Sequence, residues 1–180
     1  AIDGYVGVDF SPELLAAAIA STAGDFHERD LSRPGCLASL PSFAAITCLA
    51  TLQHLPGRAN RLALLREMGE HLSTGGRLIL STWQFRDSPR QQSKLLDWST
   101  VGLAAEQVEA NDYLVAWRRG RYAVRYVALI DQAETAALAA AAGLVVLKMF
   151  FSDGKEGNLN LYSILGRARQ RGEDAAQGDE

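Results

Sequence analysis

The sequence predicts an α/β fold with a mainly parallel sheet wound with helices and an antiparallel hairpin at its C-terminal end. Short apolar runs alternate with helical patterns through residue 83, and parallel neighbours in a sheet require such crossovers. The last two apolar runs, residues 144–151 and 159–165, are joined by a polar loop, which is typical of an antiparallel pair. The 180 residues, 48% of them hydrophobic, are enough for one such domain.

The first half of the chain carries the strand and helix signals in order. Residues 5–9 form an apolar run that ends in an acid. Ser11-Pro12-Glu13 then opens a helix, because serine is favoured at the N-cap and proline at the first helical position. We expect this helix to end near residue 20. An extended piece follows at 26–29, and the apolar run 43–50 suits a strand covered on both faces.

The clearest helical pattern covers residues 58–72, where leucines recur at helical spacing. Residues 73–76 stop this helix, and residues 77–83 form the next strand. The sharp turn between them uses Gly75 and Gly76. Strand, helix and strand with short connections extend the parallel sheet.

The second half begins with a polar, irregular segment at residues 86–121, which we interpret as a cap or insertion over the open end of the sheet. Residues 122–130 follow as a strand, and Asp131 caps a helix that ends at Gly143. From Arg167 the chain is charged and lacks a periodic apolar face. We therefore expect one domain over residues 1–166 and a disordered tail over 167–180.

Composition excludes several classes of protein. Cys36 and Cys48 lack the spacing of a zinc site or a disulfide framework, so we expect no metal and a reduced, cytoplasmic protein. No apolar run is long enough to span a bilayer, and no export signal opens the sequence. The net charge of −3 confines any nucleic-acid contact to a local patch.

Candidate ligand-binding residues follow the predicted strands. Ligands of open α/β sheets bind beyond the carboxyl ends of the strands, where an acid such as Asp9 can accept both hydroxyls of a ribose. Asp30 ends the next extended piece, and Leu49 and Ala50 end another. The alternative for Asp9 is a solvated loop acid beside a helix N-terminus, which is favourable anyway. The local pattern leaves the two interpretations equal.

These residues together resemble the class I methyltransferases that use S-adenosylmethionine, over nearly the whole chain. "GVDFSPELL" looks like the family's second strand and helix, "ERDL" like its adenine-side acid, "SFAAITCLATLQHL" like its fourth strand, and "LREMGEHLSTGGRLILSTW" like its fourth helix and fifth strand. The resemblance implies a Rossmann-like fold and S-adenosylmethionine as methyl donor. The residues that it implies for cofactor binding are Asp9, Phe10, Asp30, Leu31, Leu49, Ala50 and His54.

The family's glycine-rich loop, DxGxGxG after a first strand, is missing from this sequence. The chain begins where the second strand of the family begins. We expect a fragment that lacks the first βα unit, about forty residues long. A degenerate relative is the alternative.

The C-terminal half resembles a particular branch of the family. "DYLVAW", "RYVALID" and "FFSDGKEGNLNLYSIL" look like the enzymes that methylate carboxymethyl-uridine at the wobble position of tRNA. The resemblance implies tRNA as partner and a carboxylate as acceptor, which needs no base because it is already anionic. The alternatives are a small-molecule carboxylate or hydroxyl acceptor, and a non-catalytic scaffold or binding member of the family.

An arginine and aromatic cluster is the candidate acceptor site. Arginine suits a carboxylate or phosphate, and aromatic rings stack on unpaired bases. The candidates are Trp83, Trp117, Arg121, Arg125 and Tyr126, with Arg118, Arg119 and Tyr122 nearby. The alternative is a half-exposed edge strand with solvated arginines. We favour Arg125 and Tyr126, and with His54 they are the candidate catalytic residues. His54 has a packing role as its own alternative.

Overall fold

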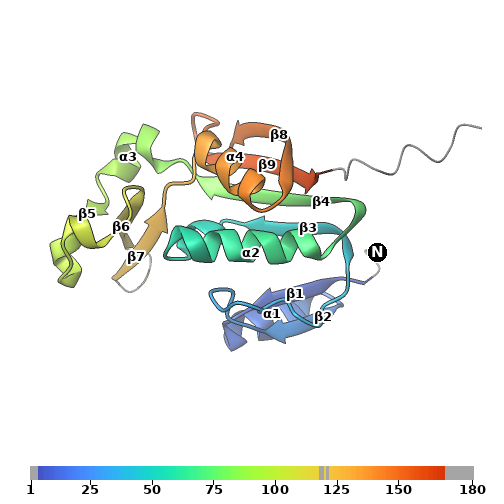
Figure 1. The fold of residues 1–180 in the computed structure, drawn as a ribbon. Helices are drawn as coiled ribbons and strands as arrows, with labels where there is room; N and C mark the ends of the chain where they lie inside the picture. The colour runs from blue at the N-terminus through green and yellow to red at the C-terminus, as the bar shows by residue number, and fades with distance from the viewer. Residues whose placement is uncertain (1–3, 118–119, 121, 169–180) are drawn as a thin grey trace, which may run out of the picture.

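The computed structural model describes residues 4–117, 120 and 122–168, whose strands form three sheets (Figure 1). The N-terminal sheet pairs β1 (Val6–Asp9) with β2 (Asp25–Glu28) in parallel. The central sheet has the order β3-β4-β9-β8, built from β3 (Phe43–Leu49), β4 (Leu72–Trp83), β9 (Asn160–Arg167) and β8 (Leu144–Ser152). The third sheet is antiparallel and contains β5 (Leu95–Leu96), β6 (Asp112–Trp117) and β7 (Ala123–Ala128).

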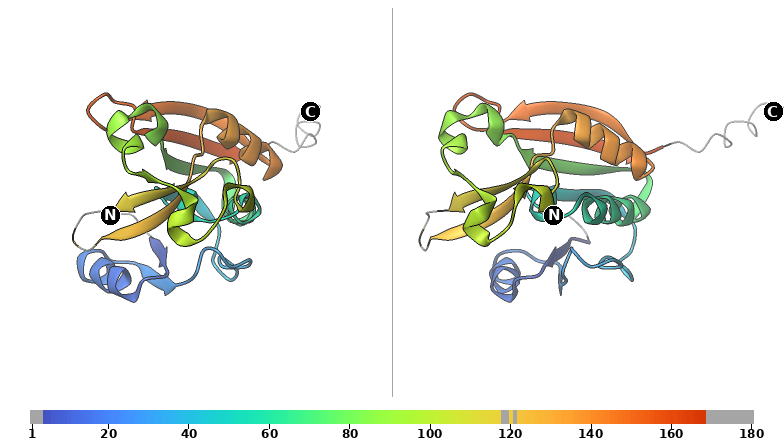
Figure 2. Two further views of the ribbon diagram at one scale, coloured as in Figure 1. Left: turned by 90° about the vertical axis from the view of Figure 1, so that its left-hand side faces the viewer. Right: turned by 60° about the vertical axis from the view of Figure 1, so that its left-hand side comes forward.

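Three longer helices lie against these strands. They are α1 (Pro12–Ser21), α2 (Arg58–Glu70) and α4 (Gln132–Ala141). In Figure 2, α2 and α4 lie together on one side of the central sheet and α1 lies on the opposite side of the molecule. The main core packs between the sheet and α2 and α4, and it includes Leu65, Leu78, Leu138 and Leu165. Short helical turns complete the fold: η1 (Leu52–His54), η2 (Phe85–Asp87), α3 (Pro89–Gln92), η3 (Trp98–Val101) and η4 (Ala105–Gln107).

The predicted α/β class is confirmed, with β3 and β4 parallel and the β8–β9 hairpin antiparallel. The helix signals are confirmed as well. The Ser11 hydroxyl accepts the N–H of Leu14 at 3.3 Å, and the Asp131 carboxylate accepts the N–H of Glu134 at 2.8 Å. Gly143 follows the end of α4 at a φ of +73°, a conformation that favours glycine.

Two local predictions are wrong. The run that contains β3 is not covered on both faces: Ile46 and Cys48 pack toward the core, whereas Thr47 and Leu49 are exposed. The physical reason is that α2 and α4 cover only one face of the central sheet. Residues 73–76 are not a turn before the strand but an irregular part of β4, where the pairing with β3 shifts register.

The segment at residues 86–121 contains η2, α3, β5, η3, η4 and β6. Strand β6 pairs with β7, so this segment forms a small antiparallel sheet with the strand that follows it. At the other end of the chain, Arg167 lies in β9 and its guanidinium donates to the carbonyl of Leu72 at 3.3 Å. Arg167 therefore belongs to β9 and not to the predicted tail, whose residues 169–180 lie outside the described residues.

One carboxylate holds the loop after β2 against α2. Glu67 accepts the N–H of Gly35 at 2.6 Å and the N–H of Leu37 at 3.0 Å. The thiol of Cys36 lies 3.5 Å from the same carboxylate. Burial, and then the negative charge of Glu67, raise the pKa of Cys36 to about 11. The pKa of Cys48 is also about 11, chiefly through burial.

Replacing Glu67 with glutamine is expected to speed the alkylation of Cys36 by iodoacetamide at pH 8. The thiolate is the reactive form, and loss of the neighbouring negative charge lowers the pKa of the thiol. The free energy of unfolding should fall by about 1–3 kcal/mol, because the N–H of the buried Leu37 and the N–H of Gly35 lose a charged acceptor. Mass spectrometry after timed labelling measures both thiols. Cys48 is the internal control, and equal rates for Cys36 in E67Q and the wild type would contradict this account.

Candidate functional site

The carboxyl ends of β1 and β2 lie side by side and present two acids. The Asp9 carboxylate accepts the N–H of Ser11 at 2.8 Å, and its backbone carbonyl accepts the N–H of Arg29 at 2.9 Å. The Asp30 carboxylate accepts both the hydroxyl of Ser32 at 2.6 Å and the N–H of that residue at 2.9 Å. These bonds, the hydroxyl first, lower the pKa of Asp30. Both acids are therefore oriented by their own loops.

A cavity of about 590 Å³ adjoins Asp30 and is lined by residues from Phe26 to Cys36. Asp9 is not among the lining residues. Leu31 is half-buried and packs against the main core, so its side chain serves packing. Phe10 is largely exposed beside Asp9.

The chain turns sharply where β3 ends. Ala50 has a φ of +51°, in the left-handed region that costs a residue with a side chain about 1–2 kcal/mol. Its N–H donates to the backbone carbonyl of Ser81, 3.0 Å away, and the Ser81 hydroxyl oxygen is also at 3.0 Å. Leu49, just before the turn, is 51% exposed. This turn places η1, which follows in the chain, beside the carboxyl end of β4.

Gln53 and His54 of η1 meet Trp83 at the end of β4. The side-chain carbonyl of the fully buried Gln53 accepts the N–H of Trp83 at 2.8 Å. The His54 ring packs edge-to-face against Trp83, with the ring centroids 5.4 Å apart. Nδ1 of His54 lies 3.0 Å from the backbone carbonyl of Tyr126. A carbonyl only accepts, so this bond assigns the proton to Nδ1 and the lone pair to Nε2.

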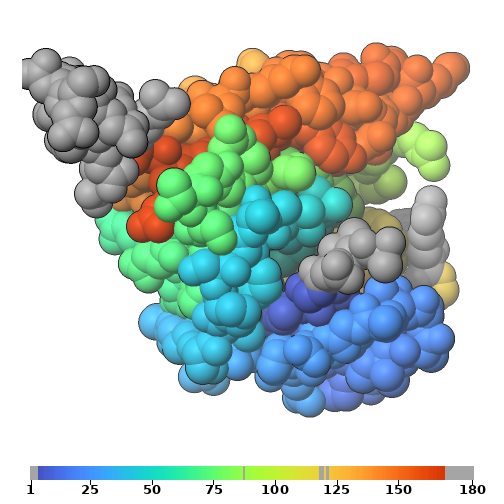
Figure 3. All heavy atoms as spheres, turned by 90° about the vertical axis from the view of Figure 1, so that its right-hand side faces the viewer, coloured from blue at the N-terminus to red at the C-terminus, as the bar shows by residue number. Residues whose placement is uncertain are grey.

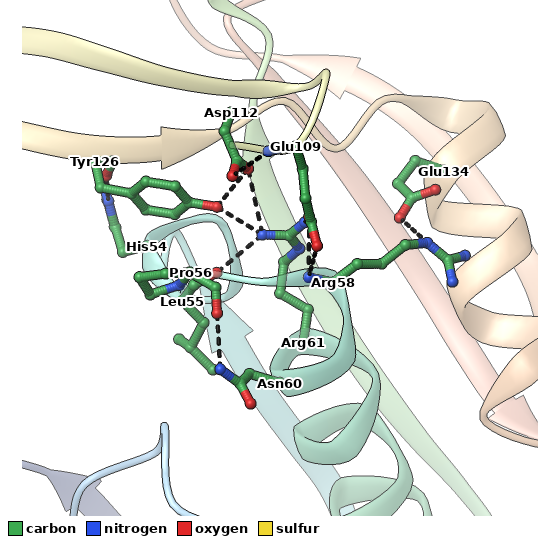
Figure 4. Close-up of polar contacts among 10 residues, drawn as sticks. All are labelled: His54, Leu55, Pro56, Arg58, Asn60, Arg61, Glu109, Asp112, Tyr126 and Glu134. Carbon is green, nitrogen blue, oxygen red and sulfur yellow. Dashed lines mark hydrogen bonds and ion pairs between the residues drawn. The ribbon is translucent and has the colours of Figure 1, made fainter. Parts of the chain in front are cut away.

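A buried arginine ties α2 to the β6–β7 sheet (Figure 4). The Arg61 side chain is 4% exposed and donates to the carbonyl of Leu55 at 2.9 Å, to the hydroxyl of Tyr126 at 2.7 Å and to the carboxylate of Glu109 at 2.6 Å. It also lies 3.8 Å from the carboxylate of Asp112, which accepts the Tyr126 hydroxyl at 2.5 Å. The network holds β7, and with it the carbonyl that orients His54.

Sequence reasoning missed Arg61, although a signal exists. Arg61 lies three and four residues before Leu64 and Leu65, so it belongs to the apolar face of α2. An arginine on a buried face needs partners, which points to carboxylates elsewhere in the chain. The residues next to Glu109 and Asp112 in the sequence do not indicate that these two acids are those partners.

The candidate acceptor residues divide between two environments on β7. Arg125 is exposed and its guanidinium lies 3.9 Å from the ring centroid of Trp117 on β6. Tyr126 is half-buried, with its hydroxyl bound to Asp112 and Arg61. Burial, and then the bond to Asp112, raise the pKa of Tyr126, which keeps it a neutral donor. Arg121, Arg118 and Arg119 lie outside the described residues.

The structure thus gathers the candidate residues into two groups. His54 contacts both Trp83 and the backbone of Tyr126. Asp9 and Asp30 lie at the ends of the neighbouring strands β1 and β2. Within residues 4–117, 120 and 122–168, no cluster of three or more His, Cys, Asp or Glu side chains could hold a metal ion. The same residues contain no helix that is long and apolar enough to cross a membrane.

Comparison with known proteins identifies this architecture. The sequence model of a family described as "Methyltransferase domain" matches residues 2–149, whereas no curated protein matches the chain. A methyltransferase from Clostridium acetobutylicum ATCC 824 that depends on S-adenosylmethionine shares the fold, with a TM-score of 0.67 and 13% identity, over 93% of this chain and 76% of its own. A second from Methanosarcina mazei has a TM-score of 0.67 and 16% identity, over 92% of this chain and 82% of its own. The sugar N-methyltransferase KedS8 from Streptoalloteichus sp ATCC 53650 has a TM-score of 0.61 and 21% identity, over 91% of this chain and 71% of its own.

The matched residues span the carboxyl ends of β1 to β4 and the β6–β7 sheet, where both groups of candidate residues lie. The chain therefore belongs to the methyltransferase domain family and has a Rossmann-like fold.

Proposed function

We propose that this domain methylates an amine or hydroxyl group of a small molecule bound beside His54 and Trp83. The observation that carries the proposal is the bond from His54 to the carbonyl of Tyr126, which leaves Nε2 as a proton acceptor. An amine or hydroxyl acceptor must lose a proton when it is methylated. A carboxylate acceptor would have no use for such a group.

Asp9 and Asp30 have the chemistry needed to hold the methyl donor. Carboxylates at neighbouring strand ends accept hydrogen bonds from ribose hydroxyls and from the exocyclic amine of adenine. Their positions at the ends of β1 and β2 fit that role. When bound, S-adenosylmethionine supplies an electrophilic methyl group on a positively charged sulfur.

S-adenosylmethionine held by Asp9 and Asp30 would supply its methyl group to the acceptor's lone pair, and the electron pair of the carbon–sulfur bond would stay on sulfur. His54 Nε2 takes the proton that the acceptor loses, while Nδ1–H remains bonded to Tyr126. Trp83 restricts the movement of the His54 ring and excludes water from one side of it.

The acceptor class is tested by measuring S-adenosylhomocysteine production with the full-length protein. The acceptors would be amines, alcohols and carboxylates matched on the same carbon skeleton. Amino sugars are included because two similar solved structures are a sugar N-methyltransferase and an amino pentose methyltransferase. We expect turnover of amines or alcohols. Turnover of the carboxylates alone would contradict the proposed role of His54.

A second candidate acceptor is the carboxymethyl-uridine of the tRNA wobble position. The exposed Arg125, stacked on Trp117, and the exposed Tyr122 favour it, because a cation and aromatic rings on one hairpin suit an unpaired nucleotide. If tRNA binds there, Arg125→Ala should reduce the slope of log affinity against log salt by about 0.7–0.9. Arg90→Ala, an exposed arginine on α3, is the control. A salt-independent affinity would contradict the tRNA hypothesis.

Replacing Asp9 with alanine is expected to weaken S-adenosylhomocysteine binding about 10- to 100-fold, since a charged acceptor contributes roughly 1.5–3 kcal/mol. Calorimetric titration of the full-length protein measures the change. Asp25→Ala removes an exposed acid at the start of β2, away from the strand ends, and should leave the affinity unchanged. Equal losses in both variants would instead indicate a general effect on folding.

A further inference from the structure

An asparagine of the C-terminal hairpin lies next to the pair formed by His54 and Trp83. Asn160 begins β9, and it is directly opposite Trp83 of β4 in the antiparallel pairing. Side chains of directly opposed residues lie on the same face of a sheet, with Cβ atoms about 4.5–5.5 Å apart. The Trp83 ring packs in turn against the His54 ring. Trp83 is therefore a common neighbour of His54 and Asn160.

The side-chain amide of Asn160 is held in one orientation. Its Nδ2 donates to the carboxylate of Asp153 at 2.8 Å, and the Tyr162 hydroxyl donates to the same carboxylate at 2.6 Å. These bonds, that of Tyr162 first, lower the pKa of Asp153, so the group is ionised at neutral pH. A carboxylate only accepts, and turning the amide round would bring Oδ1 against its negative charge. Oδ1 of Asn160 is therefore fixed on the side of the amide that does not face Asp153.

This fixed acceptor atom has no use inside the protein. Oδ1 of Asn160 is buried and has no hydrogen-bond partner among residues 4–117, 120 and 122–168. Buried polar atoms are almost always paired, because an unpaired one costs free energy. Asn160 as a whole is only half-buried, and residues 153–158 of the adjoining loop are all exposed. A small movement of this loop is enough to bring a ligand to Oδ1.

The same cluster belongs to the open face of the central sheet. Asn160 and Tyr162 alternate with the fully buried Leu161, so their side chains lie on the face opposite α2 and α4. The Tyr162 ring stacks on that of Phe150, which is 41% exposed. In the space-filling view of Figure 3, the orange-to-red atoms of β8 and β9 are at the surface of the molecule. A small molecule can therefore approach the hairpin from this side.

The methyl acceptor must satisfy three neighbours in such a site. Its lone pair faces the methyl group, and one of its hydrogens faces Nε2 of His54. A further hydrogen is needed for Oδ1 of Asn160, which can only accept. The nitrogen of a neutral primary amine has one lone pair and two hydrogens, which match all three neighbours. A hydroxyl group has no second hydrogen, so its oxygen would face Oδ1 without a proton between them.

We propose that Asn160 is a specificity-determining residue that restricts the acceptor to primary amines. It selects between the two acceptor classes of the proposed function, on which the inference rests. The lone pair of the amine forms the bond to the methyl carbon, and the carbon–sulfur electron pair stays on sulfur. One N–H proton passes to Nε2 of His54, and the other stays bonded to Oδ1 of Asn160. The product is a secondary amine whose single hydrogen cannot serve both residues, so the site favours one methylation.

The first test compares a primary amine, its N-methyl derivative and the matching alcohol as acceptors for the full-length protein. The set is built on the carbon skeleton of the acceptor that gives the fastest production of S-adenosylhomocysteine. We expect kcat/KM for the primary amine to exceed the other two values about 10-fold or more, because each of these acceptors leaves a buried atom unpaired. Asn160→Leu, which keeps the size of the side chain but removes the acceptor atom, should lower this ratio about 10- to 100-fold.

Two further variants separate specificity from a loss of folding. Asp153→Asn removes the charge that orients the amide, so the preference for the amine over the alcohol should fall. Asparagine tolerates the left-handed conformation of Asp153, which has a φ of +66°. Glu156→Gln, in the same exposed loop, is the control and should leave the ratio unchanged.

The outcomes distinguish this inference from the proposed function. Equal turnover of the alcohol and the primary amine by the wild type would overturn the role of Asn160 and leave that of His54 intact. Equal losses for all three acceptors in Asn160→Leu would do the same. Turnover of carboxylates alone would overturn both.

Nuclear magnetic resonance gives a readout that does not depend on turnover. The full-length protein, labelled with ¹⁵N and saturated with S-adenosylhomocysteine, is titrated with methylamine or methanol. The side-chain amide resonances of Asn160 should shift with methylamine, because a bond to Oδ1 polarises the amide, and should stay in place with methanol. Tetramethylammonium, a cation without N–H groups, is the control for charge. Equal shifts with methylamine and tetramethylammonium, or no shift with methylamine, would overturn the proposed contact.

Discussion

Replacing Arg61 with alanine is expected to lower the free energy of unfolding by about 3–5 kcal/mol, because it leaves buried partners without their counter-charge. The guanidinium is 4% exposed and meets the carboxylates of Glu109 and Asp112, the hydroxyl of Tyr126 and the carbonyl of Leu55. The Asp112 carboxylate is itself buried, so it cannot recover the lost interaction with water. The loss should also loosen β7 and the position of His54.

Urea unfolding of both variants at neutral pH measures this effect. Arg58→Ala is the matched control, because Arg58 is on the same helix, pairs with Glu134 at 2.8 Å and is 42% exposed. A pair of that exposure contributes about 1 kcal/mol or less. Arg61→Met should recover part of the stability through packing, although the carboxylates stay unpaired. Similar losses for Arg61→Ala and Arg58→Ala would show that the buried network does not stabilise the fold.

Replacing His54 with alanine is expected to reduce kcat for an amine or hydroxyl acceptor about 10²- to 10⁴-fold, the usual contribution of a positioned acid or base. The KM for the acceptor and the affinity for S-adenosylhomocysteine should change little, since His54 acts on the departing proton. Added imidazole should restore part of the activity, because it can occupy the vacated space and accept the same proton. Steady-state kinetics with the full-length protein separates these quantities.

His71→Ala is the matched control for the His54 variant. The His71 ring also bonds to a backbone carbonyl, that of Pro41 at 3.1 Å, but it lies at the end of α2 and away from the strand ends. It should therefore keep full activity. If His54→Ala raises KM and imidazole gives no rescue, His54 packs against the acceptor site without taking a proton.

Local sequence patterns were sufficient for the elements whose signals are local. The serine cap of α1, the aspartate cap of α4 and the glycine after α4 each depend on residues a few positions apart, and the structure contains all three. The same patterns placed Asp9 and Asp30 at strand ends.

What the sequence alone determined is the α/β class, the order of the elements and the acids and histidine at the strand ends, because hydrophobic periodicity and caps act over short distances. Only the tertiary structure decided that Arg61 meets Glu109 and Asp112 from 48 and 51 residues away, that Tyr126 orients His54, and that Thr47 and Leu49 of β3 are exposed. Buried charges choose partners in space, and the burial of a strand depends on which helices are present to cover it. Neither the partner of a buried charge nor the burial of a strand can be predicted from the neighbouring residues in the sequence.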